Sequence, residues 1–140
     1  MKLIKIFSAL IVSVLFLTSC TQVEQSPTAI PAPDDGNANV TGTILTTANK
    51  PYQELNVRLA EVYWQNGQGA YVLDEAFSPG AVTDDNGRFV IQNVPAGDYV
   101  LVIGKPMEDY KAVTDKDGNL KRVTLQSGDV IDLGNIVFDY

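Results

Sequence analysis

The sequence predicts an all-β protein, a two-sheet sandwich of seven or eight short strands with Greek-key-type connections. Residues 39–140 show no sustained apolar stripe at helical spacing, whereas short alternating runs recur between turns rich in Gly, Pro, Asn and Asp. Strands at this spacing are typical of sandwiches. The roughly 100 residues involved are enough for one domain with a hydrophobic core.

The first nineteen residues, MKLIKIFSALIVSVLFLTS, form a predicted secretory signal peptide. Lys2 and Lys5 precede an uncharged apolar run over residues 6–17, too short to span a bilayer of roughly 30 Å. The run ends in LTSC, residues 17–20, which resembles a bacterial lipobox. That resemblance implies cleavage before Cys20 and lipidation of its thiol. The alternative is an ordinary signal peptide with an incidental cysteine.

Lipidation of Cys20 predicts a protein anchored to a membrane without spanning it, because two or more acyl chains anchor stably. The following residue is Thr21, not the aspartate that resembles an inner-membrane retention signal of Gram-negative lipoproteins. We therefore expect a cell-envelope location, at the outer membrane or on the outer face of the plasma membrane. Because Cys20 is the only cysteine, disulfides within the chain and cysteine-based metal sites are excluded.

Residues 20–38 are predicted to be a disordered linker that carries the lipidated cysteine. Its three prolines (Pro27, Pro31 and Pro33) favour extended polyproline geometry, with a reach of about 55 Å. Loss of residues 1–19 removes two lysines and no acid, so the net charge goes from −7 to −9. Such a charge argues against nucleic acid and anionic headgroups as partners, and mildly favours cations or basic partners.

The strands of the predicted domain, residues 39–140, follow from their alternation. In one of them Tyr99, Leu101 and Ile103 alternate with Val100 and Val102, so both faces are apolar and the strand is predicted to be central. A polar excursion over residues 105–118 follows it. The predicted strands are residues 40–46, 55–64, 70–73, 81–83, 88–92, 99–103, 123–125 and 133–138.

The stretch TDDNGRFVIQNVPAGDYVLVIG, residues 83–104, resembles the signature of carboxypeptidase-regulatory-like domains, which belong to the transthyretin-like (prealbumin-like) sandwiches. The matching pattern is T-D-x-x-G-x-F-x-I/L-x-N-V/L-P-x-G-x-Y-x-L. Residues 42–62 and 123–138 resemble the family's opening and closing strands, whereas residues 63–78 form a longer hairpin than its generic form. The resemblance implies a prealbumin-like fold and an accessory module, not a chemistry.

Two oxygen-rich turns raise the question of a bound cation. Asp84 and Asp85 precede Gly87, which is expected to supply the positive φ of a tight turn, while Asp84 accepts backbone N–H groups. Asp115 and Asp117 lie in DKDGN, which is similar to half of a calcium-binding loop, but no Glu completes the site. We expect structural turns at both places, with calcium binding as the alternative.

Catalysis is not expected, and no catalytic residue is assigned. The chain has no histidine, which excludes Ser-His-Asp and Cys-His catalysis and the usual zinc sites. It also argues against the histidine-dependent hydroxyisourate hydrolases of the transthyretin-like fold. The glutamate that promotes isopeptide bonds in pilin-like sandwiches is replaced by Ile103. Paired carboxylates such as Asp74-Glu75 would need a substrate cleft between them, which a domain of this size does not obviously offer.

Three aromatic residues, Tyr63, Trp64 and Tyr71, surround the predicted turn at residues 66–69. They are candidate contacts for a glycan or a protein, and cross-strand packing is the alternative. We therefore expect a non-catalytic, lipid-anchored envelope protein whose sandwich is a binding or adhesion module for protein or glycan. The alternative is a structural spacer or accessory subunit of an envelope assembly, with calcium as a candidate stabiliser.

Overall fold

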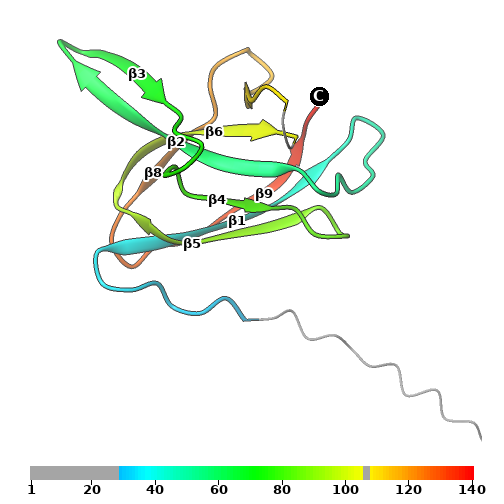
Figure 1. Cartoon of the computed structure of the whole chain (residues 1–140), viewed down its shortest axis with the longest axis horizontal. Coiled ribbons are helices and arrows are strands. Elements are labelled where there is room, and N and C mark those ends of the chain that lie inside the picture. The colour runs from blue at the N-terminus through cyan, green and yellow to red at the C-terminus, as the bar shows by residue number, and fades with distance from the viewer. Residues whose placement is uncertain (1–28, 106–107) are drawn as a thin grey trace, which may run out of the picture.

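In the computed structural model, the described residues are 29–105 and 108–140, and they form two packed β-sheets (Figure 1). One sheet has the order β5-β1-β9, and the other has the order β3-β2-β6-β7, with β4 paired to β2 and β8 paired to β6. The predicted all-β sandwich is confirmed. The strands are β1 (Asn37–Leu45), β2 (Asn56–Gln65), β3 (Gln68–Val72), β4 (Gly80–Val82), β5 (Arg88–Pro95), β6 (Gly97–Gly104), β7 (Lys111–Ala112), β8 (Arg122–Leu125) and β9 (Val130–Val137).

One strand lies where none was expected. β7 falls inside the predicted polar excursion and pairs with β6, Ala112 opposite Val102. A two-residue strand is too short for alternation to reveal it. The described part of the chain therefore has nine strands instead of seven or eight.

β6 is buried on both faces, which confirms its predicted central place. Leu101 and Ile103 pack between the sheets, in the main core with Phe89 of β5. Val100 and Val102 belong to a smaller cluster on the outer face of the same sheet. That outer cluster is covered by Tyr110, Ala112 and Leu120 of the segment between β6 and β8.

The signature stretch begins with the turn between β4 and β5. The Asp84 Oδ1 atom accepts the backbone N–H groups of Asn86 and Arg88, each at 2.8 Å. Gly87 has a φ of 72°, and its carbonyl accepts the N–H of Ile44 in β1 at 2.8 Å. The predicted structural roles of Asp84 and Gly87 are confirmed. Asp84 accepts hydrogen bonds from within the turn, and Gly87 binds the turn to β1.

The hairpin of β2 and β3 projects away from the sandwich (Figure 1). Its turn is Asn66-Gly67, with positive φ at both residues (52° and 76°), as two-residue hairpin turns of type I′ require. The turn is therefore shorter than the expected residues 66–69. Every residue of β3 is exposed.

The described end of the proline-rich segment lies against the domain. The Asn39 side-chain amide donates to the Pro31 carbonyl at 2.7 Å, and the Asp34 N–H donates to Asn93 Oδ1 at 2.9 Å. Across the described ranges, no helix has the length and apolar character needed to cross a membrane. Cys20, the predicted signal peptide and the start of the linker lie outside the described residues.

Candidate functional site

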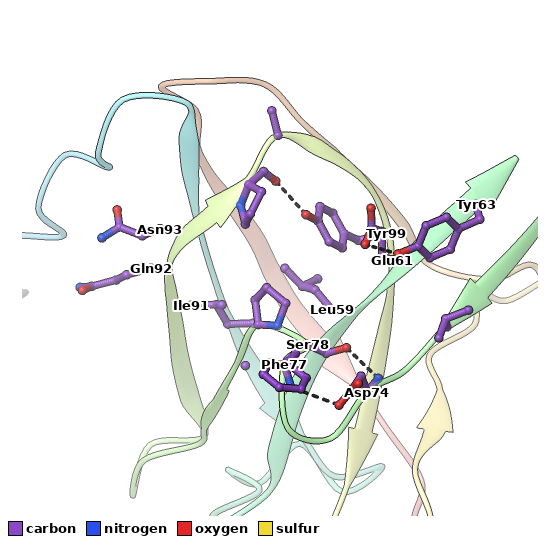
Figure 2. Close-up of a pocket in the computed structure, with 15 residues that line it drawn as sticks. Leu59, Glu61, Tyr63, Asp74, Phe77, Ser78, Ile91, Gln92, Asn93 and Tyr99 are labelled. Carbon is purple, nitrogen blue, oxygen red and sulfur yellow. Dashed lines mark hydrogen bonds between the residues drawn. The ribbon is translucent and has the colours of Figure 1, made fainter.

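A groove of about 820 Å³ opens at one side of the sandwich, where β5 approaches β2 and the segment between β3 and β4 (Figure 2). Its floor is apolar and includes Leu59 of β2, Ile91 of β5 and Tyr99 of β6. These three side chains also belong to the main core. The groove is therefore the place where the space between the two sheets reaches the surface.

β2 contributes three side chains to the groove, from a buried leucine to an exposed tyrosine. Leu59, Glu61 and Tyr63 lie two residues apart, so they share one face of the strand. Leu59 is buried, whereas Tyr63 is 55% exposed. The Tyr63 hydroxyl donates to Glu61 Oε2 at 2.7 Å (Figure 2). This hydrogen bond and the negative charge of Glu61 raise the pKa of Tyr63 above its ordinary value of 10.0.

Tyr99 lines the groove as a buried residue of its floor. Its hydroxyl donates to the Pro95 carbonyl at 2.8 Å. Burial raises the pKa of Tyr99, and the nearby Glu61 and Tyr63 raise it further. The hydrogen bond to Pro95 connects β6 to the end of β5, at the reversal between the two strands.

The segment between β3 and β4 presents Phe77, which is 85% exposed. The segment is ordered by Asp74, whose Oδ1 accepts the N–H groups of Ala76 at 2.9 Å and Phe77 at 3.2 Å. The Asp74 N–H in turn donates to Ser78 Oγ at 2.9 Å. The Phe77 ring is therefore exposed to solvent, although its backbone belongs to a hydrogen-bonded turn. Phe77 was not among the residues predicted from the sequence, where its only signal was an aromatic residue between turn-forming residues.

The β5 wall of the groove contributes backbone more than side chains. Gln92 and Asn93 line the groove, but their side chains project to the other side of β5 (Figure 2). Asn93 has a φ of 55° and donates its N–H to Asn39 Oδ1 at 2.9 Å. Among the described residues that line the groove, Glu61 and Asp74 carry charge, and none is Lys or Arg. The groove is therefore acidic, and the expectation that a domain of this size offers no cleft between carboxylates is wrong.

The three predicted aromatic contacts do not form one site. Tyr63 faces the groove, whereas Trp64, the next residue of β2, lies on the opposite face. Tyr71 pairs with Val62 and so shares the face of Trp64. Tyr63 and Phe77 both line the groove, whereas Trp64 and Tyr71 lie on the opposite face of the hairpin.

Trp64 packs on the outer face of the sheet, where it contacts polar side chains of β6 and β8. Its Nε1 donates to Asp98 Oδ2 at 3.2 Å, and the Arg122 guanidinium lies 5.1 Å from the ring centroid. Asp98 also accepts the Thr124 hydroxyl at 2.6 Å. The hydrogen bonds from Thr124 and Trp64 lower the pKa of Asp98. Trp64 thereby joins the hairpin to β6 and β8.

The acidic turns lie in two separate hydrogen-bonded loops. Asp115 Oδ1 accepts the N–H groups of Asp117 at 2.8 Å and Asn119 at 2.9 Å. The bonds from Asn119 are the largest cause of the lowered pKa of Asp115. Within residues 29–105 and 108–140, no group of three or more His, Cys, Asp or Glu residues is arranged to hold a metal ion. Calcium at Asp84, Asp85, Asp115 and Asp117 stays a prediction.

No protein-family model and no curated protein sequence matches the chain. Among solved structures, the major pilin subunit of Bacillus cereus is similar with 15% identity and a TM-score of 0.42, over 72% of this chain and 29% of that chain. A DUF3823 family protein of Bacteroides uniformis is similar with 18% identity and a TM-score of 0.45, over 72% and 42%.

A proposed carbohydrate-binding protein of Pseudomonas aeruginosa is similar with 16% identity and a TM-score of 0.43, over 74% of this chain and 91% of that chain. The chain thus spans less than a third of the pilin subunit and less than half of the Bacteroides protein. Similarities at this level do not indicate what the groove binds.

Proposed function

We propose that the domain is a non-catalytic binding module whose groove binds an uncharged glycan. The observation that carries the proposal is the pairing of two exposed aromatic side chains, Tyr63 and Phe77, with the carboxylates of Glu61 and Asp74 along one groove of about 820 Å³. A concave site with aromatic walls and a few polar groups is the usual form of a small-ligand site.

The chemistry of these four residues fits a sugar. The C–H face of a sugar ring can pack on the rings of Tyr63 and Phe77, which offer large apolar area. Carboxylate oxygens of Glu61 and Asp74 accept hydrogen bonds from sugar hydroxyls, because an ionised carboxylate is an acceptor only. The acidic lining disfavours uronic acids, phosphosugars and other anions.

The proposal places this module at the cell envelope, anchored through lipidated Cys20 and separated from the membrane by the proline-rich linker. The resemblance of residues 83–104 to carboxypeptidase-regulatory-like domains supports an accessory role without catalysis. A structural spacer or accessory subunit is the alternative function. It needs no ligand, so it leaves the exposure of Phe77 without a role.

Binding is tested by titrating the full-length protein in detergent micelles with neutral gluco-, manno- and xylo-oligosaccharides in a calorimeter. We expect Tyr63→Ala and Phe77→Ala each to weaken binding about tenfold, which corresponds to about 1.4 kcal/mol. Tyr71→Ala is the matched control, because Tyr71 is an exposed aromatic residue of the same hairpin on the opposite face.

Two results would count against the groove. Equal weakening by Tyr71→Ala would move the site to the other face of the hairpin. No heat with any of the oligosaccharides would contradict the glycan proposal and favour a protein ligand or the spacer function. Binding that requires Tyr63 and Phe77 but not Tyr71 would support the proposal.

A further inference from the structure

We infer that the free edge of β3 pairs with β3 of a second copy of this chain, which forms an antiparallel dimer through the two hairpins. Within the described residues β3 pairs with β2 alone. All five of its residues are exposed, and the outer end of the hairpin projects away from the sandwich (Figure 1). One long side of β3 is therefore open to another strand.

This edge lacks the usual protection against strand pairing. Natural edge strands are blocked by charged side chains, by proline or by β-bulges. Residues 63–73, YWQNGQGAYVL, contain no charged residue and no proline. The pairing of β2 with β3 runs without a register shift from Glu61–Val72 to Gln65–Gln68. The edge is straight, neutral and available.

The turn determines which backbone groups of β3 are free. In a two-residue hairpin the residues that flank the turn, Gln65 and Gln68, form a hydrogen-bonded pair. Alternation then directs the N–H and C=O groups of Gly69 and Tyr71 away from β2. These two residues provide the donors and acceptors that a further antiparallel strand requires.

The edge is complementary to itself. Two identical antiparallel strands are related by a two-fold axis, and an axis at Ala70 places Gly69 opposite Tyr71 of the second copy. Each bulky tyrosine then faces a residue without a side chain. The Trp64 ring already lies over Gly69, where a Cβ atom would be 3.0 Å from the ring. Tyr71 of the second copy would lie beside that ring.

The lack of charge on this edge favours a second copy over a basic or acidic partner. Loss of residues 1–19 leaves a net charge of −9, so two copies repel at long range, but not through this edge. The carboxylates nearest in sequence to the hairpin tip, Glu61 and Asp74, flank its base, and the paired segments would be neutral. An oppositely charged partner would find no ion pair at this edge. This inference does not depend on a glycan, so the two proposals can fail separately.

The register is tested by disulfide crosslinking of the full-length chain in membranes. In a dimer centred on Ala70, the two Ala70 residues form a non-hydrogen-bonded pair with Cα atoms about 4.5 Å apart, within the disulfide range. We expect Ala70→Cys to give about tenfold more crosslinked dimer under mild oxidation than Gln68→Cys. The two Gln68 residues would be about 14 Å apart, beyond disulfide reach.

Wild type, which carries Cys20 alone, measures the background in this experiment. Crosslinking of both variants to the same extent, or of neither, would overturn the inference. A second test uses charge in sedimentation velocity. Ala70→Lys and Ala70→Glu should each be monomeric because like charges lie directly opposite, and their mixture should dimerise. A mixture that stays monomeric, or a monomeric wild type at every concentration, would also overturn it.

Discussion

At the scale of single residues, Gly87 links local sequence to the sandwich. Its φ of 72° is a left-handed conformation that glycine adopts without strain. A Cβ atom at this position would also collide with the backbone oxygen of Ile44 in β1. The glycine of the signature is therefore required for its own conformation and for the approach of two strands.

Gly87→Ala is expected to lower the free energy of unfolding by at least about 2 kcal/mol, because conformational strain and collision add. Gly118→Ala is the matched control, since Gly118 has a φ of 84° and no atom within 4 Å of the added Cβ. Gly118→Ala is expected to lower the free energy of unfolding by about 1 kcal/mol, because only the backbone conformation is strained. Urea unfolding measures both. Equal losses would show that the contact with β1 is unimportant.

Trp64 reports on the ionisation of Asp98. The hydrogen bonds from Thr124 and Trp64 hold the pKa of Asp98 below its ordinary value of 3.8. Because the folded pKa is depressed, the stabilisation is present above the ordinary value and lost as the pH falls through the folded pKa. Trp64 is the only tryptophan, so its emission follows this interaction directly.

We therefore expect the fluorescence of Trp64 to stay constant from neutral pH down to about 3.8 and to change below it. Asp98→Asn should remove this transition, provided that circular dichroism shows the variant folded over the same range. A transition centred above the ordinary aspartate pKa, or one that survives Asp98→Asn, would show that Trp64 fluorescence does not report on its hydrogen bond to Asp98.

At the scale of elements, the two acidic turns show how a loop sequence can suggest a cation and still be explained by hydrogen bonds. In each turn one aspartate oxygen accepts two backbone N–H groups. Such Asx-type bonds stabilise the turn without an ion. The same carboxylates remain the residues that a calcium ion would use.

Removal of divalent cations with a chelator is expected to leave the thermal midpoint unchanged, because the turns are already satisfied internally. Asp84→Ala should instead lower the free energy of unfolding by about 1–2 kcal/mol, since it removes two hydrogen bonds to backbone N–H groups. A fall in the midpoint with chelator, restored by added calcium, would support the calcium prediction. Differential scanning calorimetry makes both measurements.

Three strands show how much of the sheet could be predicted from the local sequence pattern. The alternation of Tyr99 to Ile103 correctly predicted a central strand, because both faces of β6 are buried. The aromatic residues of the hairpin were predicted as a group, but alternation places Tyr63 and Trp64 on opposite faces. β7 was missed because two residues carry no periodicity.

At the scale of the whole molecule, the membrane anchor is the main prediction that lies outside the described residues. Cells fed a labelled fatty acid should incorporate label into the wild-type protein and not into Cys20→Ser. Fractionation should move the variant from membranes to the soluble fraction, because the acyl chains supply the binding free energy. Label on the variant, or a membrane-bound variant, would show that the lipoprotein prediction is wrong.

The sequence by itself determined the sandwich, its central strand and the hydrogen-bonded turn at Asp84 and Gly87. These depend on alternation, glycine conformation and Asx bonding, which act between residues close in the chain. Only the tertiary structure decided the groove, because β5 and the segment around Phe77 meet there through packing of two sheets. It also decided that Tyr63 and Phe77 line the same groove and that Trp64 contacts Asp98 and Arg122. Such contacts between distant segments follow from how the strands pair, which local pattern does not specify.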